Sequence, residues 1–329
     1  MRRREFIAVI AGAAVIWPVV LHAQQADRLH SLGILSFFAQ DDPQGKIWDI
    51  AFRKRLNALG WVDGRNLEIQ PRWAAGDLDR VKVFAKELTA LSPELLLGIT
   101  TPATAALQHE TRTIPILFAA VSDPIGSGFV KSLSNPGGNI TGYMFIEASL
   151  ASKWPDLMRA IAPQVSRIGL LFNPATAPYA RYYLEKFYPA AATLHIEAIE
   201  AVVTSTADIE STMAKFGDAG AGLVVMPDTF LFTNRKKVIS LAERYRLPTI
   251  YPFQNFVTEG GLISYGGDPI ETFTGAATYV DRILKGVKPN DLPVQLPTRY
   301  YLGLNLTTAK ALGISFPQSL LVTADEVIE

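Results

Sequence analysis

The stretch ELLLGITTPATAALQHETRTIPILFAAV, Glu94 to Val121, decides the fold class. It holds two short apolar runs, Glu94–Ile99 and Ile114–Ala120, each with the length of a buried strand. Between them Thr101–His109 reads as a short helix with Pro102 in its first turn, where the missing N–H leaves no hydrogen bond unmade. A strand, a helix and a second strand in this order predict two parallel strands joined by a crossover helix.

The same alternation extends toward the N-terminus over about 90 residues. Strands are predicted at 31–38 and 67–73, and helices at 47–59 and 78–91. The first of these helices ends at Gly60, a residue that suits a helix C-terminus. The first half of the chain therefore predicts a parallel sheet with helices on both faces.

A turn-rich segment, SNPGGNITGY at Ser134–Tyr143, interrupts the rhythm and predicts a crossover to a second lobe. The alternation then restarts, with strands predicted at 167–172, 196–203, 223–226, 248–251 and 262–265, and helices at 150–161, 177–194, 209–216, 236–245 and 272–284. The Pro-rich stretch Pro289–Glu329 is predicted to be irregular, with one helix near 307–312. The expected fold is α/β, with two doubly wound parallel-sheet lobes joined by a hinge. Lobe 1 is expected at 28–141 with part of 266–295, and lobe 2 at 142–265 with part of 296–329.

The N-terminus has the pattern of a signal peptide, predicted at residues 1–23. Three arginines precede an apolar run, Phe6–Leu21, that Pro18 interrupts; a retained anchor is the alternative. Arg3-Arg4-Glu5-Phe6 resembles the twin-arginine export pattern, and a general secretory signal explains it equally well. The 329-residue chain has no cysteine, which excludes a lipid anchor attached through that residue, disulfides and thiol catalysis. We therefore expect a free protein in the periplasm.

Composition narrows the class of partner. Lys plus Arg and Asp plus Glu both number 31, a balance that gives no general attraction to nucleic acid or to an anionic membrane. The residues after 23 carry three histidines, none at metal-ligand spacing with another. Neither a nucleophile elbow nor a phosphate-cradling loop is present. Neither cofactor nor catalysis is expected, although a hydrolase using the Asp123 and Asp228 carboxylates stays open as an alternative.

Polar residues follow the predicted strands of both lobes. Ligands of doubly wound sheets bind at the carboxyl ends of the strands, where loops meet helix N-termini. The residues at those positions are Thr100, Thr101, Ser122, Asp123, Asn173 and Asp228. Each has a structural alternative as a helix cap or turn residue, and Asp123, directly before a proline, suits an N-cap as well as a ligand anchor.

Aromatic residues gather near other strand ends, and their number favours an aromatic or otherwise apolar acid over a sugar or metal ion. Core packing is the alternative for each one. The set comprises Phe37, Phe38, Trp73, Tyr143, Tyr251, Phe253 and Tyr265.

The order of several motifs resembles one family. SLGILSF, LGWVDGRNLEIQPRWAAGD, GITTPATAAL and IPILFAAVSDPIGSGFVKSLSNPGGNITG, followed by RIGLLFNP, VVMPDTF, GGLISYGGD, RILKGVKPNDLPVQLP and ADEVIE, together resemble the tryptophan/tyrosine-type substrate-binding proteins of ABC transporters. The resemblance covers nearly all of the chain after residue 23 and implies the type 1 periplasmic binding fold. Known members include binders of aromatic amino acids. That group carries Ser-Asp where Met144-Phe145 stand here, and Pro-Thr-Asp-Asn where this chain has Pro227-Asp228-Thr229-Phe230, so the ligand stays open.

The resulting hypothesis is a periplasmic solute-binding protein of an ABC importer, expected to act as a monomer. It would capture an aromatic or apolar amino acid or carboxylate between its lobes, without chemistry, and deliver it to a permease in the inner membrane. A ligand-sensing protein of the same fold that serves a receptor is the alternative.

Overall fold

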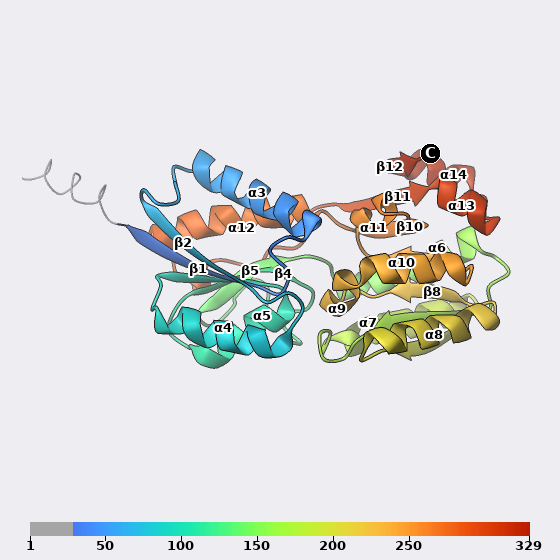
Figure 1. Cartoon of the computed structure of the whole chain (residues 1–329), viewed down its shortest axis with the longest axis horizontal. Helices are drawn as coiled ribbons and strands as arrows, with labels where there is room; N and C mark the ends of the chain where they lie inside the picture. The colour runs from blue at the N-terminus through green and yellow to red at the C-terminus, as the bar shows by residue number, and fades with distance from the viewer. Residues whose placement is uncertain (1–28) are drawn as a thin grey trace, which may run out of the picture.

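The computed structural model describes residues 29–329, so the predicted signal peptide at 1–23 lies outside the described residues. Two lobes lie side by side, each built around its own sheet (Figure 1). Among the described helices, none combines the length and apolar character that crossing a bilayer requires.

Lobe 1 is a five-stranded parallel sheet in the order β2-β1-β3-β4-β5. Its strands are β1 (His30–Ser36), β2 (Leu67–Trp73), β3 (Leu95–Ile99), β4 (Ile116–Val121) and β5 (Ile140–Met144). Its helices are α3 (Pro43–Ala58), α4 (Leu78–Ala90), α5 (Thr101–Glu110) and, from far along the chain, α12 (Pro269–Leu284). In Figure 1, α12 lies beside α3 among the N-terminal elements, and it also packs against β4 and β5.

Strand β5 corrects the prediction that 134–143 is a crossover. Its residues 140–144 pair in parallel with β4 and are mostly buried. The turn residues Pro136, Gly137 and Gly138 end before the strand begins, and the following Ile140 and Thr141 are β-branched, which suits a pleated sheet. The chain leaves the lobe only after Met144.

Lobe 2 has a seven-stranded sheet in the order β12-β11-β10-β9-β8-β6-β7. Its strands are β6 (Arg167–Phe172), β7 (Glu197–Val202), β8 (Gly222–Val225), β9 (Thr249–Tyr251), β10 (Ile263–Gly267), β11 (Tyr300–Asn305) and β12 (Glu326–Ile328). The strand pairs are parallel, except that β11 runs antiparallel to β10. The helical elements around it are η1 (Ala148–Lys153), α6 (Trp154–Ile161), α7 (Ala180–Thr193), α8 (Thr206–Asp218), α9 (Thr229–Thr233), α10 (Arg235–Arg244), α11 (Gln254–Thr258), α13 (Leu306–Leu312) and α14 (Gln318–Thr323). The short helix η2 (Pro289–Asp291) lies beside β5 instead.

The helix predicted near 307–312 is present as α13, but the prediction that the remainder of Pro289–Glu329 is irregular was wrong. This stretch also contributes η2, β11, α14 and β12. Leu302 and Leu304 of β11 are buried against β10, and Asn305 caps α13 by accepting a hydrogen bond from the Thr308 N–H at 2.9 Å. Most prolines of this stretch therefore lie in the segment that precedes β11.

Three connections join the lobes within the described residues. They follow β5, β10 and α12. The last of them runs along β5 before entering lobe 2, where the Met144 N–H donates to the Gln295 carbonyl at 2.8 Å and the Gln295 N–H to the Gly142 carbonyl at 2.9 Å. This arrangement brings the carboxyl ends of strands from both sheets to the gap between the lobes.

Candidate ligand-binding site

A pocket lies between the lobes at the carboxyl ends of β1, β3, β4, β8 and β9. Residues of both lobes line it. They are Phe38, Trp48, Thr100, Thr101, Ala120 and Ser122 from lobe 1, Phe145 from the first connection, and Tyr179, Pro227, Asp228, Thr229, Phe232 and Phe253 from lobe 2.

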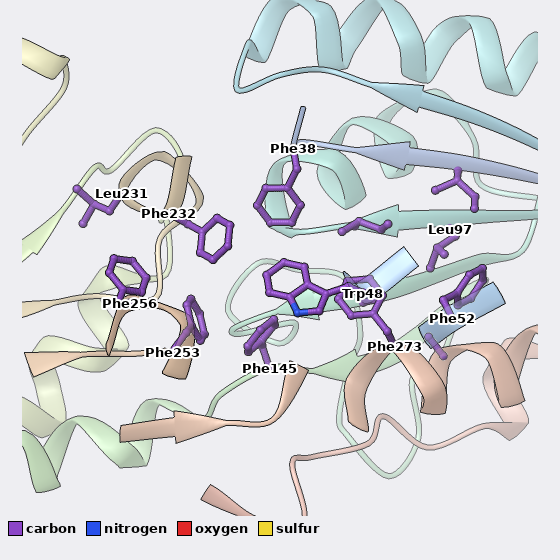
Figure 2. Close-up of a cluster of buried hydrophobic side chains, with 14 of the residues drawn as sticks. Phe38, Trp48, Phe52, Leu97, Phe145, Leu231, Phe232, Phe253, Phe256 and Phe273 are labelled. Carbon is purple, nitrogen blue, oxygen red and sulfur yellow. The ribbon is translucent and has the colours of Figure 1, made fainter. Parts of the chain in front are cut away.

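An aromatic wall closes the pocket from both sides (Figure 2). The Phe232 ring of lobe 2 lies 5.1 Å from the Phe38 ring and 5.3 Å from the Trp48 ring of lobe 1, measured between ring centroids. Below them the Phe145 ring lies 4.4 Å from that of Phe253. Such rings bury a large apolar surface and favour a flat or apolar ligand body.

A group of polar atoms marks the lobe 1 side of the pocket. Thr100 precedes α5, and its buried Oγ1 has no hydrogen-bond partner among the described residues. Its φ of +87° is unusual for a β-branched residue, and Ala120 at the end of the neighbouring strand also has a positive φ, +59°. Strained backbone of this kind concentrates at functional sites, because the surrounding fold must hold it in place.

Asp228 supplies a buried carboxylate on the lobe 2 side. Its Oδ2 accepts from the Asn173 N–H at 2.5 Å, and its Oδ1 accepts from the Thr176 hydroxyl at 2.5 Å and from the Phe230 N–H at 2.8 Å. Burial raises the pKa of Asp228 to about 6, and these hydrogen bonds hold it below the value that burial alone would give.

Tyr179 connects the two polar groups. Its hydroxyl donates to the Pro227 carbonyl at 2.5 Å. Burial and the nearby Asp228 charge raise the pKa of Tyr179 well above its usual value, while the hydroxyls of Ser122 and Thr101 act in the opposite direction.

The predicted candidates at strand ends divide into two groups. Phe38, Phe253, Thr100, Thr101, Ser122 and Asp228 line the pocket. Asp123 does not, and its Oδ1 instead accepts from the Gly126 N–H at 2.9 Å, as a capping residue does. The side chain of Asn173 likewise forms a turn, with its Oδ1 accepting from the Ala175 N–H at 2.9 Å.

Five predicted aromatic residues lie outside the pocket lining. Phe37 packs in the core of lobe 1, and Trp73 borders a small cavity on the far side of Trp48. Tyr143 packs edge-on against Tyr279, with ring centroids 4.8 Å apart. In lobe 2, Tyr251 stacks on Phe256 at 4.9 Å and Tyr265 lies 6.0 Å from Tyr300. The core-packing alternative describes the contacts of the other four, while Trp73 belongs to none of the core clusters of the described residues.

Sequence reasoning missed Trp48, Phe145, Tyr179 and Phe232 as pocket residues. Trp48 shares a helical face with Phe52 and Leu56, a pattern that indicates core packing, yet its indole lies at the cleft end of that face. Phe232 lies in α9, a one-turn helix that was not predicted. The position of Asp228 before it, as the cap of α9, is the signal that could have suggested this helix.

An ion pair also crosses between the lobes beside the pocket. Asp42, the N-cap of α3, accepts from the Arg235 guanidinium of lobe 2 at 2.8 Å through Oδ2. Arg235 also donates to Glu259 at 2.7 Å and lies over the Phe232 ring, with the guanidinium carbon 4.7 Å from the centroid. The side chain of Arg235 is only 4% exposed, so the closed arrangement of the lobes buries its charge.

Two α/β lobes that enclose a pocket at their strand ends define a binding protein of the periplasmic type, in which ligand is held between the lobes. The sequence agrees: residues 45–328 match the model of the ABC transporter substrate binding protein family, and the chain belongs to that family. Members of this class capture a solute for an ABC importer.

Relatives of known structure share the whole architecture. A conserved domain protein of Vibrio cholerae is 29% identical with a TM-score of 0.85, and the match covers 91% of this chain and 100% of that one. An ABC domain of Streptococcus pneumonia in complex with L-Trp is 28% identical with a TM-score of 0.85 and the same coverage. A tyrosine-binding protein of Clostridioides difficile is 26% identical over 266 residues, which are 80% of this chain and 75% of that protein.

Proposed function

We propose that this protein binds a small carboxylate with an aromatic or apolar body between its lobes and presents it to the permease of an ABC importer. The carrying observation is the buried Thr100 hydroxyl at the N-terminus of α5, which lines the pocket and has no hydrogen-bond partner among residues 29–329. Family membership supports the transport role, and the ligands named for two relatives, L-Trp and tyrosine, are both aromatic amino acids, each with a carboxylate.

The carboxylate would lie at the N-terminus of α5. The first backbone N–H groups of a helix have no partner within it, and the helix dipole favours negative charge there. The proline at 102 lacks an N–H, so the hydroxyls of Thr100 and Thr101 and the remaining amides supply the donors. An anion held in this way needs no basic side chain.

The ligand body would lie against the rings of the aromatic wall. Because Phe38 and Trp48 belong to lobe 1 and Phe232 and Phe253 to lobe 2, a ligand that touches rings of both lobes does so only when the lobes are closed. The ligand must bind the closed form better than the open one, and this difference is what makes occupancy detectable to a permease.

We infer the location and the oligomeric state from the sequence. The basic and apolar pattern of residues 1–23, followed by a chain without cysteine, supports export as a free protein to the periplasm. The balanced charge supports a small molecule and a permease as the partners, without nucleic acid. A monomer suits a pocket that two lobes of one chain enclose between them.

A thermal-shift screen tests the proposal on protein from Gln24 onward, refolded to remove any ligand that copurifies. The panel holds aromatic amino acids, branched amino acids, aromatic carboxylates, purines and sugars. A ligand at 100 times its dissociation constant adds about 2.7 kcal/mol to stability, so we expect a clear rise in Tm for an aromatic carboxylate or amino acid. A response to sugars or purines alone would contradict the proposal.

Thr100→Val provides the test of position. It keeps the shape of the side chain and removes the hydroxyl, so we expect affinity for the carboxylate to fall about tenfold, the equivalent of one hydrogen bond to a charged group. Thr111→Val, at the other end of α5, is the matched control, because Thr111 Oγ1 accepts only from the N–H groups of Thr113 and Ile114 in the structure. Equal losses of affinity in both variants would remove the support for this anion site.

A further inference from the structure

The carboxylate of Asp228 is held by its own lobe. The Asn173, Thr176 and Phe230 donors bind it, one at Oδ2 and two at Oδ1. A carboxylate has about four lone-pair positions, and three donors of lobe 2 already occupy positions on both oxygens. These bonds tie the loop after β6 to the start of α9, which is a structural role that the lobe needs whether or not a ligand is present.

An ammonium group in the pocket would therefore have to share the Asp228 carboxylate with three donors of lobe 2. Among the described residues that line the pocket, Asp228 is the one acid. Other acids near the cleft lie outside the lining: Asp123 caps the Gly126 turn, and Asp42 and Glu259 are both paired with Arg235. A buried ammonium that lacks three hydrogen-bond acceptors is strongly unfavourable, because its lost hydration is not replaced.

The donors of the pocket, in contrast, include an unused hydroxyl. Thr100 Oγ1 has no partner among the described residues, and the hydroxyls of Thr101 and Ser122 also line the pocket. Thr100 is 3% exposed, so its hydroxyl has no water contact to replace a missing partner. Hydroxyls and helix N-terminal amides stabilise an anion, and they do so on the lobe 1 side, across the pocket from Asp228.

We infer that the ligand is an aromatic or apolar monocarboxylate with no ammonium group on the carbon next to the carboxylate, such as an arylacetate or a 3-arylpropionate. This inference rests on the proposed function and narrows its ligand class. The pocket satisfies one charged end of a ligand and surrounds the remainder with the rings of Phe38, Trp48, Phe145, Phe232 and Phe253. The amino group of an amino acid would meet these rings and uncharged hydroxyls, in place of a carboxylate that is free to pair with it.

Matched ligand pairs test the inference by isothermal titration calorimetry on the refolded wild-type protein. Each pair differs only in the amino group: L-tryptophan with indole-3-propionate, L-phenylalanine with 3-phenylpropionate, and L-tyrosine with 3-(4-hydroxyphenyl)propionate. Tryptamine and phenethylamine, which keep the ammonium and lack the carboxylate, complete the panel. Because every arm uses the same protein, no folding difference enters the comparison.

We expect at least one acid to bind tenfold or more tightly than its amino-acid partner, and the two amines to give no heat of binding. If the amino acid of each binding pair binds as tightly as the acid or more tightly, the inference is overturned while the proposed function stands. Binding of the amines would overturn it as well, because the rings would then be a cation site. If no acid and no amino acid binds, the proposed function fails together with the inference.

Discussion

The interlobe ion pair allows a sharp test of how closure contributes to binding. Asp42→Asn removes one charge and leaves the side chain the same size. Asn is as good an N-cap as Asp, so the hydrogen bonds to the Gln44 and Gly45 N–H groups at 2.9 and 3.0 Å should persist and lobe 1 should keep its stability. The substitution then acts mainly on the contact with Arg235, which joins the two lobes.

The magnitude follows from the burial of the pair. The Asp42 and Arg235 side chains are 15% and 4% exposed, and their atoms are 2.8 Å apart. A hydrogen bond to a charged group at such a position contributes about 1.5 to 3 kcal/mol. Arg235 keeps Glu259 and the Phe232 ring after the substitution, so the larger penalty for an unpaired buried charge does not apply. Since an open form lacks the contact, the loss falls on the closed form, and the dissociation constant should rise roughly 10- to 150-fold.

Calorimetric titration of wild type and Asp42→Asn with the best ligand of the screen measures this rise, and urea unfolding of both proteins checks the fold. Asp77→Asn is the matched control, because Asp77 caps α4 in the same way, accepting from the Asp79 and Arg80 N–H groups. An unchanged dissociation constant in Asp42→Asn, with normal unfolding, would refute the reasoning that this pair stabilises the ligand-binding form.

Further predictions concern other parts of the molecule. The pKa of Asp228 is about 6 in the folded protein against an ordinary 3.8, so the unfolding free energy should fall by up to about 3 kcal/mol as pH rises from about 4 to 6. Urea unfolding of wild type and Asp228→Asn at several pH values measures this fall as a pH-dependent difference between the two proteins, and a difference that does not change with pH would contradict it. Trp48→Phe should remove most of the ligand-induced change in tryptophan fluorescence, and Trp154→Phe, in the lobe 2 core, should leave it intact. Gly266→Ala places a Cβ 1.8 Å from the Pro252 carbonyl oxygen and should destabilise the protein by about 2 kcal/mol or more in thermal unfolding, whereas Gly138→Ala, with no heavy atom within 4 Å, should have little effect.

Local pattern was enough to predict most of the elements. The strands at Leu67–Trp73 and Arg167–Phe172 have the predicted bounds. Alternation in the first and an apolar run in the second fit a strand, and both segments are shorter than a typical helix. Prediction succeeded for α13 but failed for β5 and for the strands β11 and β12, where Pro and Gly in the preceding loop outweighed a short strand signal. Such strands gain their stability from neighbours distant in sequence, here β4 for β5 and β10 for β11.

The polar part of the site was more predictable than the aromatic part. Thr100, Thr101, Ser122 and Asp228 follow from topology, since every parallel strand end of such a sheet lies on the same edge. The aromatic residues depend on which face of an element meets the cleft. Phe37 and Phe38 are adjacent at the end of β1, and one enters the lobe 1 core while the other lines the pocket. Both faces of a doubly wound sheet are buried, so alternation could not tell which residue would be which.

The contacts that close the lobes and those that surround the ligand belong to the same short segments. Asp42 and Trp48 both lie at the start of α3, and Phe232 and Arg235 lie three residues apart in lobe 2. Phe232 already touches Phe38 and Trp48, so part of the closing energy comes from the protein itself. That part has to stay small, because a protein that closed fully without ligand would give the permease no information about occupancy. The aromatic contacts and the Asp42–Arg235 pair should therefore bring the closed form within a few kcal/mol of the open one, and the ligand supplies the difference.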